Sequence, residues 1–344
     1  MKLEQNKKNF NQYLNKTILK IKKINMTETI VIVGTPRSGT TWLMELLGTI
    51  PSYTYLFEPL NPRWFPESSK IGFQSKTYLP DSADWTKGEK YLRKAFTGRL
   101  FSIGGPYELR LSKPKMILQS LLYDKLIVKS VRMNRLLPWV AKRFELRNIF
   151  YIIRHPCAVV ASQLKTGFTG HQPINPPYIN ITPNPKNILS EASKIEGLSH
   201  NILDKLKKIE KPEEILAVSW CLDNYVPLSL PKPHPWTMVI YEKLINEGEK
   251  EIIRLFNEIG EKDRSIRAIR FLKKPSKLTQ KSELNIVKNE DKQLSKWKKS
   301  LSEKQIDRIL KIVDDFGLDF YTENIEPDYQ KIKTKLRSDR FDVY

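Results

Sequence analysis

The stretch Thr29-Ile-Val-Ile-Val-Gly-Thr-Pro-Arg-Ser-Gly-Thr-Thr-Trp42 decides the fold of this chain. Its first six residues are almost continuously apolar and β-branched, which is typical of a strand buried on both faces of a parallel sheet. The residues from Trp42 to Leu47 then have helical spacing. Strand, glycine-containing loop and helix in this order form the opening unit of an open α/β fold.

The loop between this strand and helix has the chemistry of a phosphate site. Gly34 and Gly39 are spaced as in the P-loop pattern GxxxxGK[ST]. In such a loop backbone N–H groups and the start of the helix bind phosphate oxygens, and the hydroxyls of the loop can add donors. Thr40 replaces the usual lysine, and the cation of the loop is Arg37, whose guanidinium can fork onto a phosphate or leaving-group oxygen.

A second anion site is predicted after the strand 148–153. Arg154 follows this strand, where a magnesium-dependent nucleotide hydrolase or kinase usually carries an acidic residue. Ser162 lies two turns further along a helix that begins with Pro156, so it shares a face with the start of that helix. We therefore expect Arg154, Ser162 and the helix start to bind an anionic group without a metal ion.

The remaining periodicity predicts a three-layer α/β/α fold of the P-loop type, with a central, mostly parallel sheet of about five strands. The other strands are expected at 53–57, 125–129 and 236–240, and the main helices at 87–101, 135–144, 156–165, 187–207 and 212–229. We expect a basic N-terminal extension at 1–25, a single domain at 26–325 with irregular acceptor-side insertions at 62–114 and 166–185, and a C-terminal tail at 326–344.

Together the two motifs resemble the donor-binding motifs of the sulfotransferase family that uses 3'-phosphoadenosine 5'-phosphosulfate (PAPS). They are Thr-Pro-Arg-Ser-Gly-Thr-Thr-Trp at 35–42 and Tyr-Ile-Ile-Arg-His-Pro-Cys-Ala-Val-Val-Ala-Ser at 151–162. The resemblance implies PAPS as donor, adenosine 3',5'-bisphosphate (PAP) as product and no required metal. It implies that the first loop binds the 5'-phosphosulfate and the second motif the 3'-phosphate. The donor residues so assigned are Arg37, Ser38, Gly39, Thr40, Thr41, Trp42, Arg154 and Ser162.

The branch of the family is indicated by what the chain lacks. The cytosolic branch has a Lys-Thr-His element that supplies a histidine base, whereas this chain has Lys129-Ser-Val-Arg132. The glycine-rich, lysine-containing loop of that branch near the C-terminus has no good match either. Arg37, Phe57-Glu-Pro59 and Lys129-x-x-Arg132 look more like carbohydrate sulfotransferases, which implies a carbohydrate or glycolipid acceptor.

Sulfuryl transfer needs a base for the acceptor's proton and cations near the departing phosphate oxygen. Arg37 and Lys129 are the candidate cations, and Glu58, which follows the second strand, is the candidate base. Each has a simpler interpretation: Glu58 can pair with Arg132 or cap a turn, and Lys129 can be a solvated lysine at a strand end. His155 is expected to be a local feature of the helix start.

Aromatic side chains of the two insertions can either stack on a sugar or simply pack. They are Trp64, Phe65, Trp85, Phe101, Tyr107 and Phe168. The residue types and their positions leave both interpretations open.

The composition limits the partners without selecting one. With 59 Lys+Arg against 38 Asp+Glu the formal charge is +21, which favours anionic partners, although many of these cations can merely be solvated. The first 25 residues lack the apolar core of a signal peptide, and the two cysteines have no metal-ligand spacing, so we expect a cytoplasmic protein. A peripheral contact with an anionic membrane is possible, and no nucleic-acid motif is recognised.

Two other functions stay open at this stage. A P-loop kinase would share the fold, although the loop lysine and the strand-end aspartate are missing. A non-catalytic basic protein would instead bind nucleic acid or an anionic membrane with a steep salt dependence.

Overall fold

The computed structural model describes residues 24–100, 123–166, 185–230, 234–272 and 290–336. Its centre is a five-stranded sheet in the order β2-β3-β1-β4-β5, and every pairing is parallel. The strands are β1 (Thr29–Gly34), β2 (Tyr53–Phe57), β3 (Lys125–Ser130), β4 (Asn148–Ile153) and β5 (Thr237–Ile240). The predicted sheet is confirmed, and it is parallel throughout.

The central position of β1 explains its sequence. Val31 lies opposite Val128 of β3 on one side and Ile149 of β4 on the other, so both edges of β1 are hydrogen-bonded. All six residues of the strand are buried. A strand that is covered on both faces and paired on both edges has no solvent-exposed face. This explains why β1 is an uninterrupted run of small and β-branched residues.

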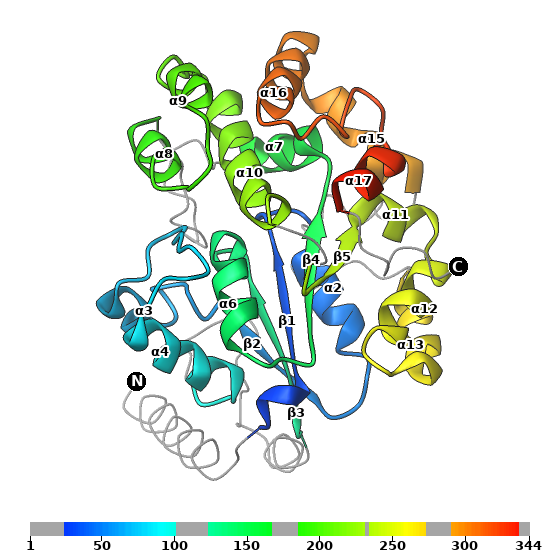
Figure 1. Ribbon diagram of the computed structural model, residues 1–344. Helices are drawn as coiled ribbons and strands as arrows, with labels where there is room; N and C mark the ends of the chain where they lie inside the picture. Colours follow the sequence, from blue (N-terminus) through cyan, green and yellow to red (C-terminus); the bar gives the residue numbers. More distant parts are fainter. Residues whose placement is uncertain (1–23, 101–122, 167–184, 231–233, 273–289, 337–344) are drawn as a thin grey trace, which may run out of the picture.

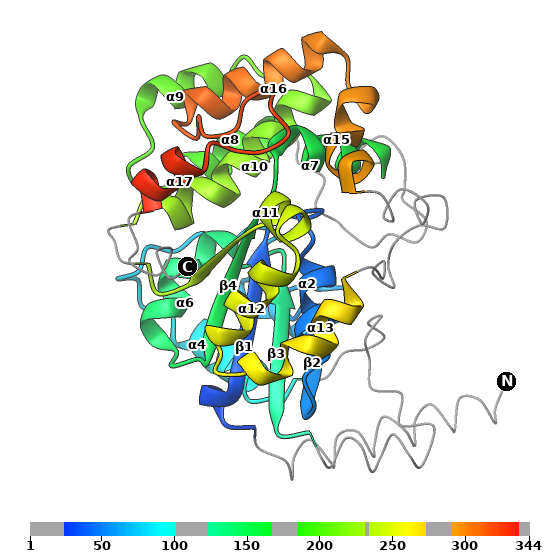
Figure 2. The same cartoon turned by 90° about the vertical axis from the view of Figure 1, so that its right-hand side faces the viewer.

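Helices cover both faces of the sheet and complete three layers. Helices α2 (Thr40–Leu47) and α6 (Leu137–Arg143) lie on opposite faces (Figures 1 and 2). The others around the sheet are α3 (Pro66–Ile71), α4 (Thr86–Phe96), α11 (Tyr241–Asn246), α12 (Glu249–Asn257) and α13 (Ser265–Phe271), with 3₁₀ turns η1 (Met26–Glu28), η2 (Asn134–Leu136) and η3 (Lys262–Arg264). Helix α17 (Tyr329–Leu336) lies beyond the strand ends, at the height of α10 (Figures 1 and 2). The three-layer architecture predicted from the sequence is confirmed.

A separate group of helices gathers beyond the carboxyl ends of the strands, at the top of Figures 1 and 2. They are α7 (Pro156–Lys165), α8 (Pro185–Ala192), α9 (His200–Leu206), α10 (Pro212–Leu228), α15 (Glu290–Ser300) and α16 (Glu303–Asp315). Helix α7 follows β4 directly, and α10 packs against both α7 and α16. The loops that leave β1, β2, β3 and β4 therefore end beneath this helical group, at the edge where open α/β sheets bind ligands.

Two predictions about helices need correction. The expected helix at 187–207 is interrupted between α8 and α9, because Gly197 adopts a left-handed φ of 79° and Ser199 caps a new helix by accepting the Ile202 N–H at 3.3 Å. The insertion expected to be irregular contains α3, which begins at Pro66 and ends at Gly72. Proline at the start and glycine at the end are ordinary helix boundaries that were missed in a short segment.

The described residues contain no helix whose length and apolarity would let it cross a bilayer. Helix α17 lies within the predicted C-terminal tail, and its Ile332 is only 1% exposed and belongs to the hydrophobic core. At least this part of the tail is packed on the domain.

Candidate active site

The loop after β1 has two residues with left-handed backbone angles. Gly39 has a φ of 94° and is the residue from which α2 begins, while Arg37 has a φ of 77°, which is uncommon for a non-glycine residue. A Cβ at Gly39 would lie 2.7 Å from the ring of Tyr241, so only glycine fits. The Ser38 side chain is fully buried, and its hydroxyl oxygen has no hydrogen-bond partner in the described part of the chain.

The two predicted donor motifs meet directly. The Arg37 Nε donates to the Ser162 hydroxyl at 2.9 Å, and Arg154 Nη1 donates to the carbonyl oxygen of Arg37 at 3.1 Å, across 117 residues of sequence. The Arg154 guanidinium also lies 4.1 Å from the centre of the Tyr241 ring. Its Nε is buried without a hydrogen-bond partner among the described residues. The arrangement brings Arg37, Arg154 and Ser162 into one cationic patch.

Side-chain hydrogen bonds that the sequence did not predict hold the loop between β1 and α2. The Tyr151 hydroxyl donates to Asn224 Oδ1 at 2.5 Å, and Asn224 Nδ2 donates to the Thr35 hydroxyl at 3.4 Å. Gln163 Nε2 donates to the carbonyl oxygen of Pro36 at 2.9 Å. Burial raises the pKa of Tyr151 well above its ordinary value, so its hydroxyl remains a proton donor. Asn224 comes from α10, far from either motif, and carries no local signal of this role.

Glu58 and Lys129 form a buried ion pair next to the donor loop. Each is 4% exposed, and Lys129 Nζ donates to Glu58 Oε1 at 2.5 Å. The Val131 N–H lies 3.1 Å from Oε1 and 3.2 Å from Oε2 of the same carboxylate. Glu58 has a left-handed φ of 53° and its N–H donates to the Lys129 carbonyl oxygen at 2.7 Å. The interpretation of Lys129 as a solvated lysine is wrong, and the ion pair of Glu58 in the described structure is with Lys129 instead of Arg132.

A second charged cluster lies behind this pair, and sequence reasoning missed it. Lys76 Nζ donates to Asp223 Oδ2 and, at 2.9 Å, to the carbonyl oxygen of Val131. Arg135 Nε donates to Asp223 Oδ1 at 3.0 Å, and its Nη1 donates to Glu191 at 2.6 Å. Burial lowers the pKa of Lys76, and the Asp223 carboxylate opposes that effect. The cluster joins the insertion at 62–114 to α10, a contact between distant segments.

His155 has the structural role expected of it at the start of α7, next to the buried Cys157. His155 Nδ1 accepts the Cys157 N–H at 3.2 Å as the N-cap of α7, and Nε2 lies 2.9 Å from the Thr322 carbonyl oxygen. These partners select the neutral tautomer with its proton on Nε2. Burial lowers the pKa of His155 to about 4 and raises the pKa of the Cys157 thiol to about 12. His155 is therefore neutral at neutral pH and capped into the fold.

The described aromatic side chains of the first insertion are packed. Trp64 and Phe65 are buried, and the Trp64 ring lies 5.3 Å from that of Phe57. The Trp85 ring lies 4.4 Å from that of Phe73. Phe101, Tyr107 and Phe168 lie outside the described residues. For Trp64, Phe65 and Trp85 the packing interpretation is the one that the structure supports.

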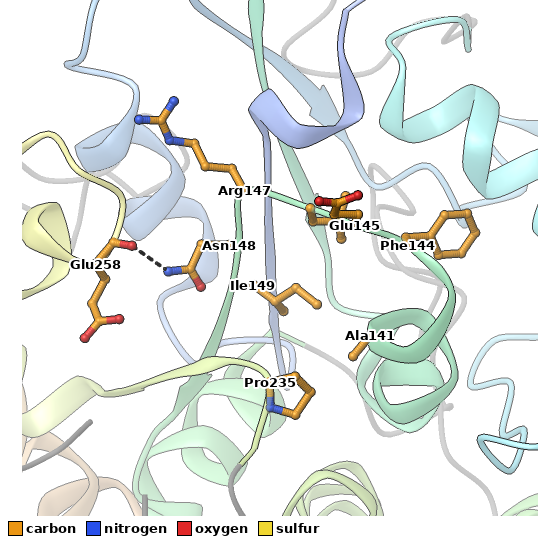
Figure 3. A pocket seen from close by; sticks show the side chains of 9 residues that line it. Ala141, Phe144, Glu145, Arg147, Asn148, Ile149, Pro235 and Glu258 are labelled. Atoms are coloured by element: carbon orange, nitrogen blue, oxygen red, sulfur yellow. Dashed lines mark hydrogen bonds between the residues drawn. The ribbon is translucent and has the colours of Figure 1, made fainter. Parts of the chain in front are cut away.

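A pocket lies beside the start of β4, at the opposite end of this strand from Arg154 (Figure 3). It is lined by Ala141, Phe144, Glu145, Leu146, Arg147, Asn148, Ile149, Pro235 and Glu258. Asn148 is the first residue of β4, whereas Arg154 follows its last, so β4 separates the pocket from the predicted donor site. Asn148 Nδ2 donates to the Glu258 carbonyl oxygen at 3.3 Å beside it. None of the predicted site residues lines this pocket.

The carboxyl edge therefore carries a coherent set of groups from four strands. The glycine loop follows β1, Glu58 follows β2, Lys129 lies near the end of β3, and Arg154 follows β4. In the glycine loop Arg37 contacts Ser162 and Arg154, and beside this loop the Glu58 carboxylate is ion-paired with Lys129. Within the described ranges no group of three or more His, Cys, Asp or Glu side chains is arranged to hold a metal ion.

A sequence profile described as "Sulfotransferase family" matches residues 29–220, which include both motifs and the Glu58–Lys129 pair. The chain belongs to the sulfotransferase family. It is thus a transferase, and the matched range covers more than half of its 344 residues. The profile does not distinguish the carbohydrate branch from the cytosolic one.

Two solved sulfotransferase structures are similar to this chain. One is a sulfotransferase domain from the curacin biosynthetic pathway, with 17% identity, a TM-score of 0.43 and coverage of 84% of this chain and 96% of that one. The other is the mouse sulfotransferase SULT7A1 complexed with PAP, with 12% identity, a TM-score of 0.42 and coverage of 89% of each chain. No curated protein sequence matches this sulfotransferase significantly.

Proposed function

We propose that this sulfotransferase takes the sulfuryl group from PAPS and transfers it to a hydroxyl or amine of a carbohydrate or glycolipid, releasing PAP. The observation that carries the proposal is the junction of Arg37, Arg154 and Ser162 above β1 and β4. At this junction the Ser38 hydroxyl and Arg154 Nε are buried without partners among the described residues. Buried polar atoms are rarely left unsatisfied, and the phosphate oxygens of a bound nucleotide would satisfy these.

The donor's two phosphate ends fit two parts of this junction. The backbone around Gly39, with Arg37, Ser38, Thr40 and Thr41, would bind the 5'-phosphosulfate at the start of α2, because the helix N-terminus and its free N–H groups attract anions. Arg154 and Ser162 would bind the 3'-phosphate. Trp42 packs edge-on against Tyr241 at 6.3 Å and would hold the ring on which Arg154 rests.

The chemistry assigned to the remaining residues follows from their contacts. The acceptor oxygen attacks sulfur, the bond between sulfur and the bridging oxygen of the 5'-phosphate breaks, and the electron pair of that bond leaves on the phosphate. Glu58 takes the acceptor's proton, through Oε2, whose hydrogen-bond partner in the described structure is the Val131 N–H at 3.2 Å. Lys129 orients the carboxylate through Oε1, and with Arg37 it would stabilise charge on the departing phosphate oxygen.

The carbohydrate acceptor is supported by residues at the same edge. Arg37, the Phe57-Glu-Pro59 element and Lys129-x-x-Arg132 are the features that resemble carbohydrate sulfotransferases. Residues 129–132 contain no histidine, unlike the Lys-Thr-His element of the cytosolic branch. Glu58 is therefore the candidate base.

Calorimetric titration with PAP tests the proposal. Wild-type protein should bind PAP, and Arg154→Ala should bind it about 10- to 100-fold more weakly, because a charge-assisted contact is worth about 1.5–3 kcal/mol. Arg93→Ala, which removes an exposed arginine paired with Glu89 on α4, is the matched control and should bind like wild type. A wild-type protein that does not bind PAP would overturn the proposal.

A second assay separates the proposal from the kinase alternative. Sulfuryl transfer from PAPS should continue in the presence of EDTA, since no metal is assigned a role in the step. Turnover of ATP that depends on magnesium, with no transfer from PAPS, would support the kinase instead.

A further inference from the structure

Arg132 is a buried cation without a carboxylate partner in the described structure. It is 2% exposed, and the contact of its guanidinium is a 3.3 Å hydrogen bond from Nη1 to the Ser75 hydroxyl. Its Nη2 is buried and has no hydrogen-bond partner among the described residues. A buried charge that forms no ion pair is costly, so this position is suited to a ligand that supplies one.

The neighbouring cations differ from Arg132 in this respect. Lys129 is paired with Glu58, and both Lys76 and Arg135 are paired with Asp223. Together with Arg132 these make four cations, and with Glu191 the carboxylates number three, so the described cluster has one positive charge in excess. The excess is located on the arginine that has no ion pair.

Two further side chains of the same segment have free hydrogen-bonding atoms. Both amide atoms of Asn134 and Nη2 of Arg135 are buried without a partner in the residues that the structure describes. Asn134 and Arg135 open the 3₁₀ turn η2, directly after Arg132 and Met133. Four buried polar atoms without a partner in the described residues therefore fall within the four-residue segment 132–135.

The position of this segment indicates which substrate it faces. Arg132 follows the end of β3, and its Ser75 contact comes from the loop between α3 and α4, within the insertion on the β2 side of the sheet. The donor loop and Arg154 lie toward the other side, after β1 and β4. Burial lowers the pKa of Arg132, and the Glu58 carboxylate, which is itself ion-paired with Lys129, opposes this effect.

We propose that the segment 132–135 binds a negatively charged group of the acceptor, so that this sulfotransferase acts on an anionic acceptor such as a sugar that carries a carboxylate or an ester sulfate. Arg132 supplies the charge through its planar guanidinium, and Arg135 Nη2 and the Asn134 amide supply further hydrogen bonds. A neutral acceptor leaves Arg132 with no counter-charge beyond Glu58, whose carboxylate is already ion-paired with Lys129. Sites of this kind discriminate strongly against analogues that lack the matching group. The inference rests on the proposed function, because it assigns the acceptor side of that site.

The test uses the full chain saturated with PAP, so that the donor site is occupied. Methyl glucuronide and methyl glucoside are the probes, because they differ in one carboxylate, and sodium chloride keeps the ionic strength equal. Each is titrated while the thermal unfolding midpoint and the calorimetric heat are recorded. Methyl glucuronide should raise the midpoint of the wild-type protein, and methyl glucoside should leave it unchanged.

Variants locate the effect. Arg132→Gln should weaken methyl glucuronide binding about 10- to 100-fold, the loss expected for one charge-assisted contact. Arg132→Lys keeps the positive charge but loses the planar guanidinium that can form two parallel hydrogen bonds to a carboxylate, so it should retain part of the binding. Arg93→Gln removes an exposed arginine on α4 and should behave like wild type.

The outcomes separate this inference from the proposed function. If PAP does not bind, the proposed function fails before any sugar is added. If PAP binds but the two sugars act alike on the wild type, or if Arg132→Gln responds to methyl glucuronide like wild type, the anionic acceptor site is wrong. The wild-type comparison decides the matter even if Arg132→Gln does not fold.

Discussion

The two sides of the carboxyl edge are built in different ways. The side after β1 and β4 consists of a strained glycine loop, a helix start and two arginines, Arg37 and Arg154, and the buried Glu242 carboxylate beside them accepts the His155 N–H at 2.8 Å. The side after β2 and β3 consists of buried ion pairs, with Glu58 on Lys129 and Asp223 on Lys76 and Arg135. One side offers backbone and positive charge to an anion, whereas the other holds a carboxylate in place.

Under the proposed function, this difference separates the sites of the two substrates. A donor that always has the same phosphates can be bound by a short local motif. An acceptor side that must hold a carboxylate at a fixed position needs buried partners from several segments, because each buried charge has to be compensated. Substitutions on the two sides should therefore fail in different assays, and the four predictions that follow begin with the largest effect.

Glu58→Gln should separate the two sides most sharply. The substitution removes the proposed base while keeping the shape of the side chain, so transfer from PAPS should fall by about 10²- to 10⁴-fold. The dissociation constant for PAP should stay within about twofold, since Glu58 contacts no donor residue in the described structure. The turnover number and a PAP titration measure the two effects, and turnover near the wild-type rate would remove Glu58 as the base.

Asp223→Asn should damage the whole acceptor side through stability. It leaves Lys76 and Arg135 buried without their shared carboxylate, and breaking such a pair costs about 3–5 kcal/mol of unfolding free energy. Asp81→Asn is the matched control: Asp81 forms an exposed pair with Lys142 at 3.1 Å, so its loss should cost less than about 1 kcal/mol. Denaturant unfolding measures both, and equal losses would show that the buried cluster does not hold the fold.

The pH dependence of the unfolding free energy tests the role of His155, the N-cap of α7. The folded pKa of His155, about 4, lies below its ordinary value of 6.5, so the unfolded chain binds more protons between these values. Its contribution to stability is therefore complete above pH 6.5 and is lost as pH falls toward 4, up to about 3 kcal/mol. His155→Asn keeps a cap on α7 without titrating in this range, and the unfolding free energy of that variant should depend less on pH. Parallel pH profiles for the two proteins would contradict the assignment.

Gly39→Ala should weaken donor binding with the smallest loss of the four. Its Cβ would meet the Tyr241 ring at 2.7 Å in a left-handed conformation, at a cost of about 1–3 kcal/mol. Gly72→Ala is the control, because Gly72 has a φ of 116° but its Cβ would meet nothing closer than 3.6 Å. Both variants should lose stability, and only Gly39→Ala should lose PAP affinity; unchanged affinity would show that this loop does not bind the donor.

The donor side could be predicted from the sequence because its determinants are local. The run of Thr29–Gly34 reports a fully buried strand, and the glycine spacing reports the loop that follows it. Arg154 and Ser162 are placed by the strand end and by two turns of α7. Periodicity and turn chemistry are properties of neighbouring residues, so one sequence is enough to recognise them.

The acceptor side could not be predicted in the same way. Lys76 and Asp223 are 147 residues apart, and nothing near either residue indicates that the other will neutralise it. Glu58 was placed at the correct strand end, but its partner was open between Arg132 and a turn, and the structure selects Lys129 and the Val131 N–H. Several cations lie near each carboxylate, and the packing of α10 and the insertion against the sheet decides which of them forms the ion pair. This packing cannot be recognised from a single sequence.

Val131 has a role that is mechanical rather than chemical. Its N–H holds the Glu58 carboxylate, and its carbonyl oxygen is held in turn by Lys76 at 2.9 Å. Because both its N–H and its carbonyl oxygen are hydrogen-bonded, the Val131 backbone has little freedom to rotate. A shift of Lys76 is therefore passed on to the Glu58 carboxylate. A change in the segment around Lys76 that admits a different acceptor would therefore also move the Glu58 carboxylate. Under the proposed function, acceptor selectivity and catalytic rate would then change together.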